Sequence, residues 1–78
     1  PQELINVPVK SKPKLDSVPA IAAKAAEVER LLGGDGRLLL RYSGTEPKCR
    51  VMIEAADPGL CQRLARELAD VVARELGA

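Results

Sequence analysis

The segment RLLLRYSGTEPKCRVMIEA, residues 37–55, contains two alternating apolar runs separated by a short polar loop. The first run, 37–42, predicts a strand with apolar side chains on both faces, such as Leu38 on one and Leu39 on the other. Apolar residues on both faces are typical of a largely covered strand, so we expect it to be central. The second run, 50–55, predicts a strand that returns antiparallel to the first.

Upstream of this hairpin, residues 4–10 alternate with Ile5, Val7 and Val9 on one side, the pattern of a half-buried strand. Pro8 lacks a backbone N–H and indicates an edge strand or a bulge.

Two helices are predicted by apolar residues at helical spacing. The first carries Pro19 in its first turn and ends at Gly33, and the second begins at Asp57, an N-cap acid followed by Pro58. The apolar stripes consist of Ile21, Ala25, Val28 and Leu32 in the first helix and of Leu60, Leu64, Leu68, Val71 or Val72, and Leu76 in the second.

The order β-α-β-β-α favours an α+β fold, a two-layer sandwich in which a small antiparallel sheet is covered on one face by two helices. Residues 1–78 make one domain, and the start at Pro1 without methionine suggests a piece of a longer protein. The other face of the second helix, with Arg63, Arg66, Glu67, Asp70 and Arg74, is interpreted as solvated surface, with partner binding as the alternative.

Composition argues against several classes of partner. Twelve basic and eleven acidic residues give a net charge of +1, and one aromatic residue, Tyr42, offers no stacking platform, so no nucleic-acid partner is expected. No apolar run approaches the ~20 residues needed to span a bilayer, so no membrane partner is expected. Cys49 and Cys61, in a chain without histidine, fit neither a zinc site nor a disulfide framework and are typical of a reducing, cytoplasmic setting. We expect Cys49 to be a packing residue rather than a reactive thiol.

The polar loop has the composition of an anion-binding site. Arg41 and Arg50 supply guanidinium donors that match phosphate geometry, and Ser43 and Thr45 supply hydroxyl groups. Gly44 is free to adopt a positive φ, which would let successive backbone N–H groups point into one concavity. An ordinary hairpin loop with solvated arginines is the alternative that spacing alone leaves open.

Glu46 would repel a phosphate, so we expect it to pair with an arginine or to face a hydroxyl or amine of the ligand. The chain has no nucleotide P-loop motif, and Ser43 has no histidine to activate it as a nucleophile. The glycine run 33–36 fits a KH-domain G-x-x-G by letter, but it is interpreted as a helix stop.

The stretch RYSGTEPKCRVMIEA closely resembles the C-terminal domain of the α-D-phosphohexomutases, and within them the bacterial phosphoglucosamine mutases. NVPVKSKPKLDSVP and GGDGRLLLR extend the resemblance over nearly the whole chain. It implies a TATA-binding-protein-like fold within a four-domain enzyme that moves a phosphate between the 6- and 1-positions of a hexose, a step in cell-wall precursor synthesis in the bacterial enzymes.

The resemblance also implies roles for single residues. The phosphoserine and the magnesium ion of such enzymes lie in other domains, so this chain alone should hold no catalytic residue, metal or cofactor and be inactive. Its partners would be a phosphosugar and the other domains. The residues that would bind the non-transferring phosphate of the sugar are Arg41, Ser43, Gly44, Thr45 and Arg50.

Two positions depart from the family pattern. Tyr42 stands where proline is frequent and is expected to loosen the loop slightly. Lys48 and Cys49 replace a more usual apolar pair, with Lys48 on the rim or in solvent. The alternatives are a phosphomannomutase or phosphoglucomutase C-terminal domain, a nucleic-acid-binding α+β module, and an interaction domain that uses the second helix.

Overall fold

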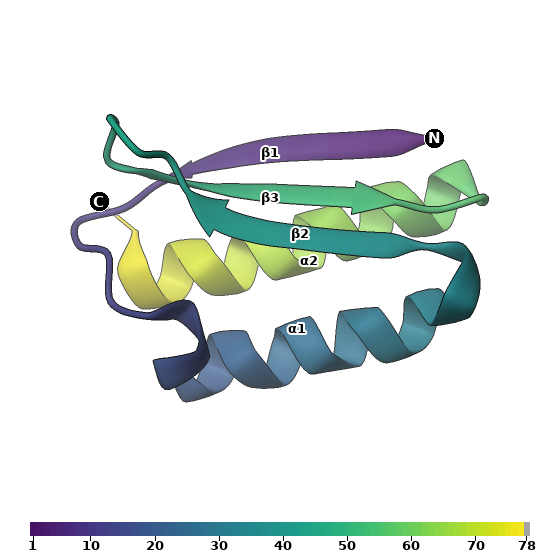
Figure 1. Ribbon diagram of the computed structural model, residues 1–78, viewed down its shortest axis with the longest axis horizontal. Coiled ribbons are helices and arrows are strands. Elements are labelled where there is room, and N and C mark those ends of the chain that lie inside the picture. The colour runs from purple at the N-terminus through teal and green to yellow at the C-terminus, as the bar shows by residue number, and fades with distance from the viewer. Residues whose placement is uncertain (78) are drawn as a thin grey trace.

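The computed structural model describes residues 1–77 and contains three strands and two long helices (Figure 1). Their order is β1 (Gln2–Pro8), α1 (Pro19–Leu32), β2 (Arg37–Tyr42), β3 (Lys48–Glu54) and α2 (Pro58–Leu76). Short 3₁₀ turns, η1 (Leu15–Ser17) and η2 (Gly33–Asp35), lie before and after α1. Both helices lie on one side of the sheet, so the predicted β-α-β-β-α two-layer sandwich is confirmed.

The sheet has the order β1-β3-β2, and β3 pairs antiparallel with both neighbours. The prediction of a central 37–42 strand is therefore wrong, because β2 is an edge strand. The face of β2 toward the helices is only half-buried, and Leu39 on the opposite face is 37% exposed. Apolar residues on both faces of this strand reflect an apolar patch on the open face rather than coverage from both sides.

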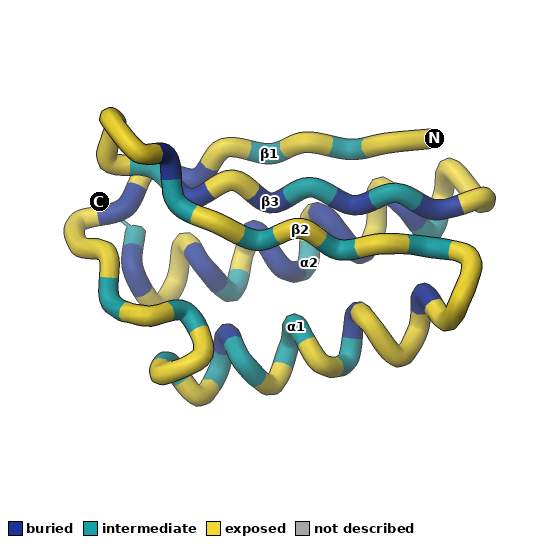
Figure 2. The backbone as a smooth tube through the Cα atoms, in the orientation of Figure 1, coloured by how far each residue is buried: buried dark blue, intermediate teal, exposed yellow. Residues whose placement is uncertain are grey.

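The core lies between the sheet and the helices. Cys49, Val51 and Ile53, the inward residues of β3, are fully buried, and Figure 2 shows the buried positions concentrated along β3 and α2. Leu64 and Leu68 of α2 are also fully buried. Burying one Leu or Val side chain stabilises the folded state by about 1.5–3 kcal/mol compared with leaving it exposed. Such a layer is important here because a small domain buries a smaller fraction of its surface on folding than a large one.

The predicted helix ends are confirmed. Pro19 stands in the first turn of α1, and Gly33 ends it with φ of 63°, a conformation that glycine adopts without strain. Asp57 caps α2 by accepting hydrogen bonds from the N–H groups of Gly59 at 2.9 Å and Leu60 at 3.4 Å.

An ion pair joins the two helices. Lys24 of α1 lies 2.5 Å from Glu27 and 2.8 Å from Glu67 of α2. These carboxylates raise the pKa of Lys24, and Lys24 in turn lowers the pKa of Glu27. Glu67 thus contacts the neighbouring helix, although its position on α2 had suggested solvated surface. Neither helix within residues 1–77 is long and apolar enough to cross a membrane.

Candidate anion-binding site

The loop 43–47 joins β2 to β3 at the end of the sheet where β1 also ends (Figure 1). Its neck is closed by a hydrogen bond from the Ser43 N–H to the Lys48 carbonyl at 2.9 Å. The Val9 N–H donates to the Pro47 carbonyl at 2.9 Å, so the segment after β1 holds the other side of the loop. The loop is therefore fixed by backbone contacts to both neighbouring segments.

Arg41 and Arg50 lie directly opposite each other on β2 and β3. Both alternate with inward residues, so both project from the open face of the sheet, away from the helices. Within residues 1–77, neither guanidinium has a carboxylate partner within 4.0 Å. Two like charges directly opposite in a sheet repel each other, and a bound anion would relieve that repulsion.

Ser43 is the only buried polar residue of the described chain, with 5% of its surface exposed. Its hydroxyl oxygen accepts hydrogen bonds from the N–H groups of Thr45 at 3.4 Å and Glu46 at 3.2 Å. Its own proton has no acceptor among residues 1–77 and can be donated to a ligand. The loop thus bends around the Ser43 hydroxyl.

Gly44 supplies the loop's open backbone donor. Its N–H has no hydrogen-bond partner in the described chain, whereas the N–H groups of Ser43, Thr45, Glu46 and Lys48 all do. The expected concavity of successive free N–H groups is therefore not formed in this structure. Gly44 does not adopt a positive φ either, and a Cβ atom placed on it would meet nothing within 4 Å.

Glu46 forms an ion pair with Lys48, with Oε1 3.3 Å from Nζ. Of the two expectations for Glu46, the pairing with an arginine is not found among residues 1–77, and the contact with a hydroxyl or amine of the ligand stays a prediction. This ion pair holds the Glu46 carboxylate beside the loop exit. There the Lys48 ammonium group offsets the negative charge of Glu46, which would otherwise repel a phosphate. Lys48 is accordingly half-buried rather than plain solvated surface.

Tyr42 tethers the loop rather than loosening it, which corrects the expectation from its place in the motif. Its hydroxyl donates to the Pro13 carbonyl at 2.5 Å, and burial raises its pKa. A second contact runs the opposite way, because the Lys12 ammonium donates to the Ser43 carbonyl at 2.7 Å. The segment after β1 and the start of the loop are therefore linked by reciprocal hydrogen bonds.

Sequence reasoning missed two residues that lie next to the predicted site residues, Lys12 and Asn6. Lys12 is 31 positions from its partner, and no local signal indicates a contact over such a separation. Asn6 lies opposite Arg50 on β1, so it extends the row of Arg41 and Arg50 across the open face. Alternation places Asn6 on the polar side of its strand, but strand register is needed to place it beside an arginine.

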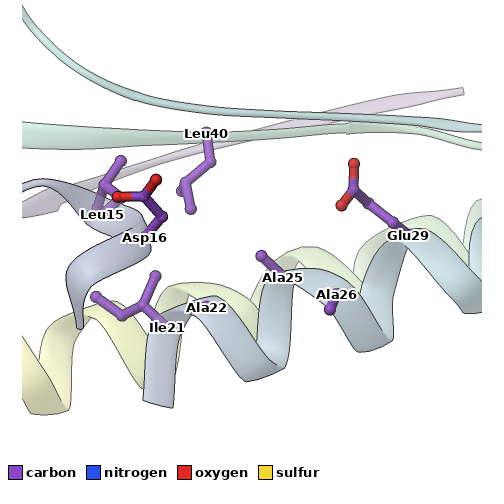
Figure 3. Close-up of a pocket in the computed structure, with 8 residues that line it drawn as sticks. All are labelled: Leu15, Asp16, Ile21, Ala22, Ala25, Ala26, Glu29 and Leu40. Atoms are coloured by element: carbon purple, nitrogen blue, oxygen red, sulfur yellow. The ribbon is translucent and has the colours of Figure 1, made fainter. Parts of the chain in front are cut away.

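Other features of the chain are poor anion sites. A cavity of 260 Å³ lies between α1 and β2 and is lined by Ile21, Leu40 and small apolar residues, with the carboxylates of Asp16 and Glu29 at its rim (Figure 3). Those carboxylates would repel a phosphate. Cys49 is fully buried, and desolvation raises its pKa to about 11, so the thiol is a packing group as predicted. Within residues 1–77, no three acidic, cysteine or histidine side chains are grouped to hold a metal ion.

Comparison with known proteins places the chain in a family. Residues 4–71 match the family model described as phosphoglucomutase/phosphomannomutase, C-terminal domain. The phosphoglucosamine mutase of Solidesulfovibrio magneticus is 53% identical over 97% of this chain, and that of Protochlamydia amoebophila is 47% identical over 99%. The chain spans 17% of the length of each of these relatives.

Solved structures agree with the sequence relatives. The chain aligns over its full length with 16% of Aspergillus fumigatus N-acetylphosphoglucosamine mutase in complex with glucose 1,6-bisphosphate, with a TM-score of 0.82 and 30% identity. It aligns over 92% of its length with 15% of the same enzyme in complex with GlcNAc-6P and magnesium, with a TM-score of 0.75 and 32% identity. The chain belongs to the phosphoglucomutase/phosphomannomutase C-terminal domain family and is most similar, among these relatives, to phosphoglucosamine mutases.

Proposed function

We propose that this chain is the C-terminal, phosphate-binding domain of a longer enzyme of the phosphoglucosamine mutase type. Such an enzyme is an isomerase that interconverts the 6-phosphate and 1-phosphate of a hexosamine. The observation that carries the proposal is the pair of Arg41 and Arg50, which face each other beside the loop without a carboxylate partner within residues 1–77.

Each residue has a chemical role in this proposal. Arg41 and Arg50 neutralise the phosphate that is not being transferred, because planar guanidinium groups match two phosphate oxygens at once. The hydroxyl groups of Ser43 and Thr45 donate hydrogen bonds to the remaining oxygens. Gly44 offers its open N–H and allows the phosphate to approach the backbone closely.

The catalytic contribution of such a site is positioning. Holding one phosphate in place fixes the opposite end of the sugar, and orientation is a large share of the barrier reduction in phosphoryl transfer. An anchor that contacts only phosphate also accepts the sugar in both orientations that a mutase requires. Asn6, in the row beyond Arg50, is placed to meet a sugar hydroxyl or amine.

The remaining machinery belongs to other parts of the enzyme. The residues of this chain do not fit a magnesium site, since no metal-binding cluster exists among those described. We assign the phosphoserine and the magnesium ion to the other domains, and the chain by itself is inactive. Two unpaired, buried cysteines accord with a cytoplasmic enzyme.

A ¹H–¹⁵N NMR titration of the 78-residue chain with glucosamine 6-phosphate at low salt tests the proposal, with glucosamine as the control. We expect saturable shifts of the Gly44 and Thr45 amides with the phosphate ester only, at about millimolar affinity (~4 kcal/mol). Glucose 6-phosphate and mannose 6-phosphate should shift the same amides, because the loop and the two arginines bind the phosphate group that all three sugars carry. A folded chain whose loop amides respond equally to glucosamine and to its phosphate would contradict the proposal.

A further inference from the structure

We propose that Lys12 is a positioning residue of the phosphate site, which directs the Gly44 N–H toward the ligand by holding the Ser43 carbonyl. This inference rests on the proposed function, since it assigns the Gly44 N–H to the phosphate. Lys12 lies in the segment between β1 and η1, outside the motif that carries the arginines and hydroxyl groups.

The Lys12 contact acts on a single peptide group. The Ser43 carbonyl and the Gly44 N–H belong to the same peptide, which is planar and trans like every peptide in the described chain. In a trans peptide the C=O and N–H bonds point in opposite directions. A contact that holds the Ser43 carbonyl toward the segment after β1 therefore turns the Gly44 N–H away from that segment.

The contact is short and charge-assisted. The Lys12 ammonium lies 2.7 Å from the Ser43 carbonyl oxygen, within the range of hydrogen bonds to ionised donors. A cation at the carbonyl also polarises the peptide and strengthens its N–H as a donor. Lys12 thus acts on both the direction and the donor strength of the Gly44 N–H.

The same N–H is the one that the loop leaves open. The other N–H groups between Ser43 and Lys48 are bonded within the loop and its neck, and Pro47 has none. Space around Gly44 is open, since a Cβ atom there would meet nothing within 4 Å. A polarised donor facing open space is a binding feature rather than a folding contact.

Charge near the segment supports the assignment. Lys12, Lys14 and Arg41 line a cavity of about 490 Å³ along the free edge of β2, with Asp16 as its acidic residue. The Tyr42 hydroxyl, which donates to the Pro13 carbonyl, holds the backbone next to Lys12 at the same place. Lys12 and Arg41 thus line the same cavity, and the Tyr42 hydrogen bond holds the backbone next to Lys12.

The test compares Lys12→Met with Lys10→Met in the 78-residue chain. Lys10 is in the same segment, and its side chain forms no hydrogen bond or ion pair within residues 1–77, so both variants lose one charge but only one loses the contact. The ¹⁵N shift of the Gly44 amide without ligand reports the peptide directly. Titration with glucosamine 6-phosphate reports binding, and the α2 amides report the fold.

We expect Lys12→Met to move the Gly44 ¹⁵N resonance and to weaken binding about three- to tenfold, with the α2 amides unchanged. Lys12→Arg, which keeps a charged donor, should restore both. If Lys12→Met matches Lys10→Met in both readouts while the wild-type chain binds the sugar phosphate, the role of Lys12 is overturned and the proposed function stands. A wild-type chain that does not distinguish glucosamine 6-phosphate from glucosamine overturns the proposed function and this inference together.

Discussion

Arg41 and Arg50 are directly opposed across β2 and β3, on the face of the sheet that the helices leave open. Like charges at opposed sheet positions destabilise the folded state by about 0.2–1 kcal/mol. We therefore expect Arg41→Met to raise the free energy of unfolding by that amount while weakening glucosamine 6-phosphate binding at least tenfold. Urea denaturation and NMR titration of the same samples measure the two effects.

Arg37→Met is the matched control for this prediction. Arg37 lies on the same face of the same strand but pairs with Glu54 at 3.1 Å, so its removal should neither stabilise the chain nor change binding. An Arg41→Met variant that is less stable than wild type would show that Arg41 makes stabilising contacts in the folded chain even without a bound anion.

Gly44→Ala separates folding from binding at the loop. A Cβ atom at Gly44 meets nothing within 4 Å among residues 1–77 and the residue has no positive φ, so the variant should fold with stability equal to wild type or about 0.4–1 kcal/mol higher. The added methyl group would occupy the space where a phosphate approaches the N–H, so binding should weaken by roughly tenfold, or about 1.4 kcal/mol.

The control for Gly44→Ala is Gly34→Ala, because Gly34 also has open space and no positive φ but lies in η2, before the end of β2 that is opposite the loop. Chemical denaturation should give similar results for both variants, and titration should distinguish them. Equal affinity in the two variants would mean that the ligand does not approach the Gly44 backbone.

Local features of the chain were predictable, whereas contacts between distant segments were not. The bounds of β2 and the start of α2 follow from alternation and from the Asp57 cap, which act over a few residues. Alternation assigns faces but not neighbours, which is why β2 was expected at the centre of the sheet. An apolar residue such as Leu39 on the open face gives the same pattern as one under a second layer.

The same limit applies to the candidate site. The motif brings Arg41 and the loop together because they are close in sequence, and an antiparallel hairpin then places Arg50 nearby. The partners of Lys12 and Tyr42 depend on the path of the chain between β1 and α1, which side-chain pattern does not determine. These contacts are set by tertiary packing, so only the fold reveals them.

Ser43→Ala tests how the loop keeps its shape. The hydroxyl oxygen accepts from two loop N–H groups, and the net contribution of a hydrogen bond is about 0.5–1.5 kcal/mol. We expect faster hydrogen exchange at Thr45 and Glu46, weaker binding, and little change in α2. Ser11→Ala is the control, since Ser11 is exposed and outside the loop. Unchanged exchange at both loop amides would show that the backbone holds this conformation without the hydroxyl.

Alkaline pH should destabilise the chain through Cys49. Burial raises the pKa of this thiol from 9.0 to about 11, so the folded state favours the neutral form. Below about pH 9 the thiol is protonated in both the folded and the unfolded chain, and its contribution to stability is fully present. As the pH rises toward 11, the unfolded chain loses the proton first, and the free energy of unfolding falls. The raised pKa values of Tyr42 and Lys24 act in the same direction.

Cys49→Ala isolates the part of this decline that belongs to the thiol. The variant should be less stable at neutral pH because it leaves a cavity beneath β3, but its free energy of unfolding should fall less steeply between about pH 9 and 11. Tyr42→Phe keeps the Cys49 thiol, so the contribution of the thiol to the pH dependence of the free energy of unfolding should remain. Urea titrations at several pH values give the slopes, and alkylation at about pH 8 should be slow in the folded wild-type chain. Parallel stability curves for wild type and Cys49→Ala would mean that the thiol titrates alike in both states. Rapid alkylation of Cys49 itself, rather than of Cys61 in α2, would mean that β3 opens often enough to expose it.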